Sequence, residues 1–297
     1  MGAASMLLSL LLLGAAVAEE PGYVETIQNW RSELEANLKK DSGWLTVAGL
    51  YWLREGENSV GAGITNDFVL PEGSAPDVVG VFEFEDRTAT FKVADGVTVT
   101  QPGPENDNPE AVQTVVLEMG QKHALAINDL TMWVHYSGPR LAIRLRDLNS
   151  TLRKEFTGLK WFPVDPRYKV KAKFTPHREP KKIELLNILG DIESFESPGY
   201  VDFEIMGQSV RMEPTSARGG ALKFVFRDGT SGKESYPAAR FLRAEAPKNG
   251  EVTLDFNRSY NPPCAYNPHT TCEIPTKENR LGIRIEAGEK NYHDTHS

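Results

Sequence analysis

Two acidic residues in a glycine-rich segment are the side chains of this sequence best suited to acid–base chemistry. The segment spans residues 226–236, and its polar side chains are those of Arg227, Asp228, Ser231, Glu234 and Tyr236. If two strands flank its turn, these side chains meet at one rim. Asp228 or Glu234 would then act as a general base, and Arg227 or Arg240 would hold an anionic group through two parallel hydrogen bonds. The alternative is a solvent-exposed hairpin with alternating charges.

A second polar segment, residues 255–280, has no helical or strand periodicity after Phe256. A long irregular segment persists in a compact domain when it is clamped or functional. Its Asn257 and Asn261 could contact a ligand, or they could satisfy the backbone of the segment itself. Both interpretations stay open.

Both cysteines of the chain, Cys264 and Cys272, lie in this second segment. In an exported protein such a pair favours a disulfide, and closing so short a loop would stabilise the fold by roughly 2–3 kcal/mol. Free thiols are one alternative. A metal site that adds His269 and His293 is another, because these donor types suit zinc. We expect the disulfide and no metal.

A third candidate lies earlier in the chain. The segment Leu141–Asp147 alternates apolar and basic residues, so Arg144 and Arg146 share one face of a predicted strand. There they would meet a carboxylate from the second half of the chain or bind an anion.

The hydrophobic pattern predicts a scaffold made mainly of β-strands. One helix is expected at residues 23–40, where the apolar side chains recur at helical spacing. From Trp44 onward, short runs rich in β-formers alternate with turns of Gly, Pro, Asn and Asp. Many short strands of this kind indicate an all-β sandwich or barrel. We expect the helix to pack on a sandwich, followed by a second β domain or a barrel or sandwich extension.

The chain divides at several compositional shifts. An apolar run from Met6 to Val17, followed by an Ala-x-Ala cleavage pattern, predicts a secretory signal and a secreted or periplasmic protein; an uncleaved anchor is the alternative. The expected parts are a signal at 1–18, a helix at 19–42, a β-sandwich at 43–150, a second β domain with the Cys/Asn/Pro-rich loop at 151–290, and a tail at 291–297.

The net charge and the absence of known motifs limit the classes of partner that we expect. The net charge of −8 argues against nucleic acid or an anionic membrane as a partner, because both need a basic face. No nucleotide-binding loop, HExxH, GxSxG or EF-hand pattern occurs. We therefore expect a small polar or anionic partner and no cofactor.

Part of the predicted sandwich resembles a forkhead-associated (FHA) domain. Residues 53–70 contain the Leu, the Gly, the apolar-Gly pair and the Asn66-Asp67 pair that open such domains. Gly61 is followed by Ala62 where the family has its phosphate-binding Arg. The resemblance therefore implies a sandwich fold without phosphothreonine recognition.

Several blocks together resemble the uncharacterised family DUF1684, from about Trp30 to Lys290. The blocks are Gly43-Trp-Leu-Thr-Val-Ala-Gly-Leu-Tyr-Trp-Leu53, Trp161-Phe-Pro-Val-Asp-Pro-Arg-Tyr168, Phe226-Arg-Asp-Gly-Thr-Ser-Gly-Lys-Glu-Ser-Tyr236, Asn-Pro-Pro-Cys264 with Cys272, and Glu286-Ala-Gly-Glu-Lys290. The resemblance implies a β-rich protein without an established activity.

These observations lead to one functional hypothesis and two alternatives. We expect a polar or anionic ligand in a cleft between the two β halves, with hydrolysis by Asp228 or Glu234 as the chemistry that needs no cofactor. The expected ligand-binding residues are Arg144, Arg227, Tyr236, Arg240, Asn257 and Asn261. The first alternative is a non-catalytic protein whose polar C-terminal loop only stabilises the fold, and the second is a metal site at the Cys/His loop.

Overall fold

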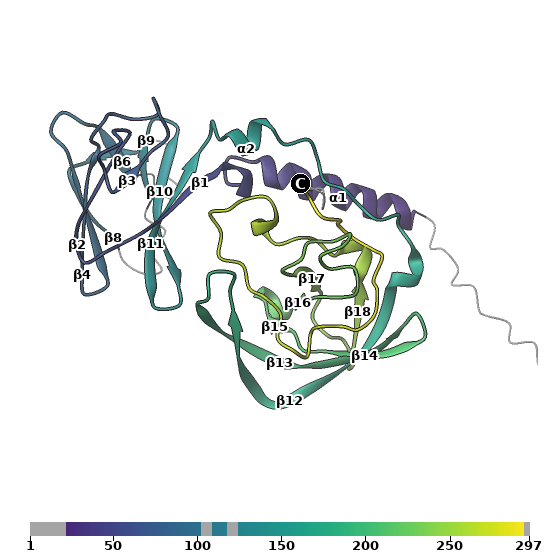
Figure 1. The fold of residues 1–297 in the computed structure, drawn as a ribbon. Coiled ribbons are helices and arrows are strands. Elements are labelled where there is room, and N and C mark those ends of the chain that lie inside the picture. The colour runs from purple at the N-terminus through teal and green to yellow at the C-terminus, as the bar shows by residue number, and fades with distance from the viewer. Residues whose placement is uncertain (1–21, 102–108, 118–123, 294–297) are drawn as a thin grey trace, which may run out of the picture.

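The computed structural model describes residues 22–101, 109–117 and 124–293, which are mainly β with one long helix at the N-terminal end (Figure 1). The expected signal segment and the last residues of the expected tail lie outside the described residues. Two hydrophobic cores organise the strands. The first contains residues from Val60 to Leu145, and the second contains residues from Tyr168 to Ala287.

The first core lies between two sheets that form a β-sandwich. Within the described residues, the six-stranded sheet has the order β1-β11-β10-β9-β6-β7 and the five-stranded sheet the order β3-β2-β4-β5-β8. Their strands are β1 (Val47–Trp52), β2 (Gly56–Gly61), β3 (Phe68–Val69), β4 (Gly80–Glu85), β5 (Thr88–Val93), β6 (Val99–Gln101), β7 (Glu110–Val112), β8 (Thr114–Leu117), β9 (Ala124–Ile127), β10 (Leu130–Ser137) and β11 (Arg140–Asp147). Frequent turns between short half-buried strands explain this architecture.

Alternation along β11 decides which side chains face the second half of the molecule. Leu141, Ile143 and Leu145 are buried in the sandwich core. Successive side chains of a strand point to opposite faces, so Arg144 and Arg146 lie on the outer face of the six-stranded sheet. This outer face therefore carries both arginines of the predicted basic strand.

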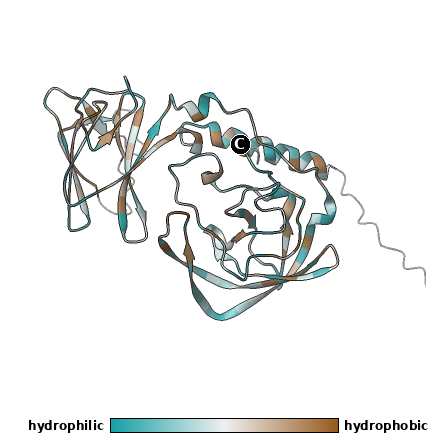
Figure 2. Cartoon of the chain, viewed as in Figure 1, coloured by the Kyte–Doolittle hydropathy of each residue, from teal (hydrophilic) through white to brown (hydrophobic). Residues whose placement is uncertain are grey.

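The second core lies between a four-stranded sheet, β14-β13-β12-β18, and a three-stranded sheet, β15-β16-β17, among the described strands. Neither sheet closes into a barrel over the described residues. The strands are β12 (Lys169–Leu186), β13 (Ile192–Ile205), β14 (Gln208–Met212), β15 (Thr215–Ser216), β16 (Leu222–Phe226), β17 (Arg240–Ala244) and β18 (Glu251–Asp255). The long β12–β13 ribbon carries many hydrophilic residues, whereas hydrophobic residues recur along the sandwich strands (Figure 2).

Helix α1 (Tyr23–Lys39) confirms the predicted helix but packs on a different partner from the one expected. It lies along the second half of the molecule and not on the sandwich that follows it in sequence (Figure 1). The Tyr23 hydroxyl donates to Asp255 Oδ1 at 2.8 Å, and Arg31 Nη2 donates to the Phe162 carbonyl at 3.0 Å. A short helix, α2 (Thr151–Lys154), follows the sandwich. The remaining helical turns are the 3₁₀ segments Trp44–Thr46, Pro166–Tyr168, Arg218–Gly220, Phe256–Arg258 and Pro263–Ala265.

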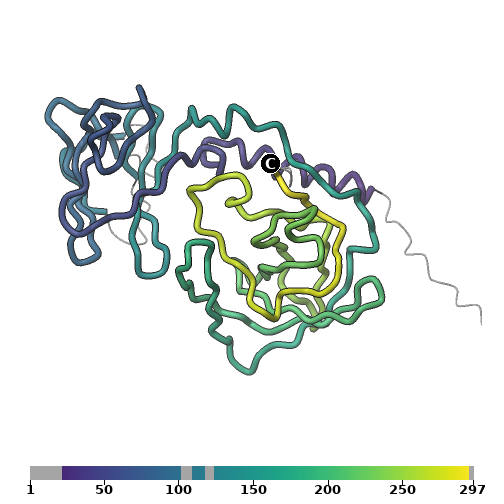
Figure 3. Tube along the Cα trace, in the orientation of Figure 1, coloured from purple at the N-terminus to yellow at the C-terminus, as the bar shows by residue number. Residues whose placement is uncertain are grey.

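Between β18 and residue 293 the chain forms no further strand and loops back over the second half (Figure 3). Buried Asn267 fastens this segment to the sandwich, since its Nδ2 donates to the carbonyls of Trp44 at 2.9 Å and Val47 at 2.7 Å. Near its end, Tyr292 packs in one cluster with Leu38 of α1. The irregular segment therefore links the helix, the sandwich and the second core.

Candidate functional site

A pocket of ≈ 530 Å³ lies between the outer face of the six-stranded sheet, the end of α1 and the C-terminal irregular segment. Pockets of this size hold small organic molecules in many proteins. It is lined by Leu34, Asn37, Leu38, Ser42, Gly43, Trp44, His135, Arg144, Lys223, Phe241, Arg243, Tyr260, Asn261, Pro263, Tyr266, Thr270, Thr271, Cys272 and Glu273. Two of the residues predicted to bind a ligand, Arg144 and Asn261, therefore line the same pocket.

Arg144 is a buried cation in this pocket. Only 6% of the residue is exposed, and its Nε and Nη2 atoms have no hydrogen-bond partner within the described parts of the chain. The guanidinium lies over the Trp44 ring, 5.5 Å from its centroid. Burial lowers the pKa of Arg144 to about 10, so the side chain still carries its charge at neutral pH. A buried charge of this kind is costly unless a partner compensates it.

His135 closes the pocket beside Arg144. Its Nε2 lies 3.0 Å from Thr271 Oγ1, which joins β10 to the irregular segment. Burial, and then the neighbouring Arg144, lower the pKa of His135 to about 4. The imidazole is therefore neutral at physiological pH and adds no positive charge.

Asn261 belongs to a second buried polar cluster, centred on Glu289. The Asn261 backbone N–H donates to Glu289 Oε2 at 2.8 Å, and its Nδ2 donates to Glu289 Oε1 at 2.9 Å. The Tyr266 hydroxyl lies 3.2 Å from both carboxyl oxygens. Burial raises the pKa of Glu289 to about 8, while these hydrogen bonds and Arg240 act in the opposite direction. The cluster fixes where Asn261 stands in the pocket wall.

The two cysteines lie next to each other at the pocket. The Cys264 backbone N–H donates to Cys272 Sγ at 3.2 Å, and both residues are free cysteines in the structure. The expected disulfide is therefore not formed here. A hydrogen bond between the two side chains lowers the pKa of Cys264, and this side-chain bond together with burial raises the pKa of Cys272. Of the two, Cys272 lines the pocket.

No metal site accompanies the cysteines. Over the residues that the structure describes, His269 and His293 included, no group of three or more His, Cys, Asp or Glu side chains is placed to hold a metal ion.

Asp228, a predicted general base, lies in a fully buried network with Arg240. Both side chains are 0% exposed, and Arg240 Nη1 lies 3.4 Å from Asp228 Oδ2. The carboxylate also accepts hydrogen bonds from Thr230 Oγ1 at 2.7 Å and from the Ile285 backbone N–H at 2.6 Å. Arg240 in turn donates to the carbonyls of Ile285 and Ala287. This geometry attaches the end of the chain to β17 and leaves Asp228 enclosed by donors.

The other predicted residues are dispersed. Glu234, 39% exposed, pairs with Arg284 at 2.7 Å. The backbone of Arg227 pairs with Arg280. The Tyr236 hydroxyl donates to the Cys264 carbonyl at 3.1 Å, behind the pocket wall.

Asn257 is buried below β18, where its Nδ2 donates to the Asp165 carbonyl at 2.8 Å and to the Tyr23 hydroxyl at 3.0 Å. It thus holds α1 and the start of β12 together. Of the two roles considered for Asn257, the structure shows the second, in which the side chain forms hydrogen bonds with the protein itself.

Sequence reasoning missed several pocket residues, namely Trp44, His135 and Thr271. His135 lies on the outer face of β10 together with Trp133, since these two residues pair with Ala142 and Arg144 of β11. The alternation of side chains along β10 could therefore have placed His135 on the same face as Arg144. Nothing local in the sequence marks Thr271, because its partner lies in another part of the chain.

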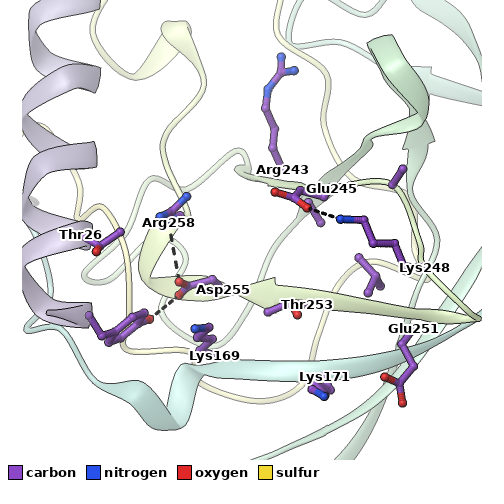
Figure 4. Close-up of a pocket in the computed structure, with 14 residues that line it drawn as sticks. Thr26, Lys169, Lys171, Arg243, Glu245, Lys248, Glu251, Thr253, Asp255 and Arg258 are labelled. Atoms are coloured by element: carbon purple, nitrogen blue, oxygen red, sulfur yellow. Dashed lines mark hydrogen bonds and ion pairs between the residues drawn. The ribbon is translucent and has the colours of Figure 1, made fainter. Parts of the chain in front are cut away.

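A second pocket, also of ≈ 530 Å³, lies along β17 and β18 near the start of α1 (Figure 4). Its charged side chains are already paired in part: Asp255 accepts from Tyr23, and Lys248 lies 3.4 Å from Glu245. Lys248 and Glu245 are 81% and 89% exposed. The close-up shows Arg258 directed towards Asp255, and the two side chains form an ion pair at 3.9 Å.

The Asp228–Arg240 network predicts a stability difference between the two candidate acids. Asp228→Ala should lower the free energy of unfolding by about 3–5 kcal/mol, because it leaves Arg240 buried without its carboxylate. Glu234→Ala, at a surface pair, should change it little. Urea unfolding of both variants beside the parent protein measures the difference. A small loss in both would show that Arg240 does not depend on Asp228.

Glu289 predicts a pH dependence of stability. Its folded pKa, about 8, lies above that of a carboxyl in an unfolded chain, so the folded state holds the proton more tightly. The free energy of unfolding should therefore be highest below about pH 4 for this group and fall as the pH rises towards 8, by on the order of 3 kcal/mol. Glu289→Gln should remove that fall.

Urea unfolding of the parent protein and of Glu289→Gln at pH 5 and pH 8 tests this expectation. The informative quantity is the difference between the two proteins at each pH, since other groups titrate equally in both. A difference that does not change with pH would contradict a raised pKa.

Known proteins place the chain in a family. No curated protein matches it. The family described as "Protein of unknown function (DUF1684)" matches residues 154–290, which contain the second core and the irregular segment. The chain is also similar to an uncharacterized protein of Haloarcula marismortui whose structure was solved by solution NMR. The two share 31% identity over 46% of this chain and 78% of that chain, with a TM-score of 0.40. This chain belongs to the DUF1684 family.

Proposed function

We propose that the protein binds a small organic anion in the pocket between the sandwich and the C-terminal segment, with Arg144 as the anchor. The observation that carries the proposal is the buried guanidinium of Arg144, whose Nε and Nη2 atoms have no partner within the described residues. An anion there would supply the missing charge and accept both hydrogen bonds.

The charges around Arg144 support an anionic ligand. Lys223 lies 2.7 Å from Glu273, so this pair is neutral as a unit. His135 is neutral as well, because burial lowers its pKa. Arg243, which is exposed and donates to the Tyr260 hydroxyl at 3.0 Å, adds a second positive charge to the wall. The pocket thus has a net positive charge inside a protein of net charge −8.

We propose that the pocket binds the anion without a chemical reaction. The expected hydrolysis by Asp228 or Glu234 is not part of it, because Asp228 is enclosed by its donors and Glu234 pairs with Arg284. Export remains part of the proposal on the strength of the apolar N-terminal run in the sequence.

Arg144→Met tests whether Arg144 anchors the anion, because we expect it to weaken ligand binding without weakening the stability of the protein. Arg144→Met should abolish the thermal stabilisation by small carboxylates and weaken their binding at least tenfold. The same change should leave the unliganded protein as stable as before, or more stable by about 1–2 kcal/mol, because an uncompensated buried charge is removed.

The matched control is Arg146→Met on the same strand face. Arg146 donates to Thr46 Oγ1 at 2.8 Å and to the Ser42 carbonyl at 3.0 Å and lies over the Trp133 ring. Its loss should lower stability and leave anion binding intact. Titration calorimetry and urea unfolding on both variants decide the matter. Unchanged binding by Arg144→Met, or a large loss of its stability, would refute the proposal.

A further inference from the structure

The residues that line the pocket include a second one with a buried, unpartnered polar atom, whose chemistry is opposite to that of Arg144. Asn261 is 1% exposed, and its Oδ1 has no hydrogen-bond partner in the described part of the structure. Its Nδ2 donates to Glu289 Oε1 at 2.9 Å and to the Lys290 carbonyl at 2.7 Å. A carbonyl can only accept, so the amide orientation is fixed and the unpartnered atom is an acceptor.

A ligand that satisfies both residues needs two different groups. Arg144 requires an anion, and Asn261 Oδ1 requires a hydrogen-bond donor. Acetate meets the first requirement and not the second. The wall therefore favours an acid that carries a hydroxyl, an ammonium or an N–H group.

The charges of the pocket favour a hydroxyl over an ammonium. Arg144 and Arg243 are both cations, and Glu273 is already paired with Lys223. The carboxyl behind Asn261 is that of Glu289, whose raised pKa leaves it largely protonated at neutral pH. Among the described residues that line the pocket, no unpaired carboxylate would compensate a ligand ammonium, and a nearby guanidinium would repel it.

The rest of the wall favours an apolar ligand body. Leu34 and Leu38 of α1 line one side, and Trp44 and Phe241 contribute aromatic rings. With a volume of ≈ 530 Å³ the pocket is larger than a two- or three-carbon acid needs. A chain or ring of moderate length would cover these side chains and exclude water from Arg144.

We infer that the ligand is a hydrophobic hydroxycarboxylic acid, with its carboxylate on Arg144, its hydroxyl donating to Asn261 Oδ1 and its apolar part against α1 and Phe241. This inference rests on the proposed function, because it names the ligand class of the same pocket.

A matched series of eight-carbon ligands tests the inference on the parent protein by titration calorimetry. The series consists of octanoate, 2-hydroxyoctanoate, 3-hydroxyoctanoate, 2-aminooctanoate and octan-1-ol. One of the hydroxy acids should bind about fivefold more tightly than octanoate, in line with one added hydrogen bond to a buried acceptor. The amino acid should bind more weakly than octanoate, and the alcohol should not bind.

The outcomes separate this inference from the proposed function. If no acid binds, the proposed function fails. If octanoate binds and neither hydroxy acid binds more tightly, the hydroxyl assignment fails while anion binding by Arg144 stands. Tighter binding by the amino acid would also overturn the hydroxyl assignment.

Asn261→Ala then locates the hydroxyl. The ratio of the affinities for the better hydroxy acid and for octanoate should fall from about five to about one in this variant, because general damage to the pocket affects both ligands. The control is Asn267→Ala, at an equally buried asparagine of the same segment that is not in the pocket wall. That variant should keep the ratio of the parent protein. A ratio that persists in Asn261→Ala would refute the assignment, and if the variant does not fold, the ligand series still decides.

Discussion

The structure depends on a buried arginine that fastens the end of the chain to the second core. Arg240 has no exposed surface, and it bonds Asp228 and the carbonyls of Ile285 and Ala287. Residues 256–293 contain no strand, so the polar backbone of this segment must find partners outside a regular ladder. Buried side chains such as Arg240 provide them. The same attachment requires a glycine at position 288. Its φ is +80°, and a Cβ at this position would lie 2.5 Å from the Ser259 carbonyl oxygen.

The pocket is a consequence of this attachment. Once the segment is held on the second core, its residues 261–273 face the outer surface of the six-stranded sheet, where Asn267 and Thr271 bind the sandwich. The sandwich places Arg144 there because its alternate neighbours, Ile143 and Leu145, occupy the core. A cation that would be solvated on an open sheet face is thereby enclosed. The free-energy cost of burying the Arg144 charge therefore depends on which other groups enter the pocket.

Local pattern was sufficient for the helix, for the mainly β architecture and for the basic face that contains Arg144. It failed where partners are distant in sequence. Asp228 and Glu234 look equivalent in a polar turn, yet one accepts a bond from Ile285, 57 residues away, and the other pairs at the surface. The same limit explains why α1 was expected on the sandwich.

The two pocket residues with unpartnered atoms, Arg144 and Asn261, come from different halves of the molecule, and a ligand that contacts both would connect these halves. Arg144 belongs to β11, whereas Asn261 follows β18 and is fixed by Glu289. The two halves are joined near the pocket by the hydrogen bond between His135 and Thr271 and by the two hydrogen bonds of Asn267. A ligand that bonds Arg144 and Asn261 together would add links of the same kind across the same junction. Since ligand binding stabilises whichever state contains the complete site, occupancy would favour the arrangement of the two halves seen in this structure over any looser one.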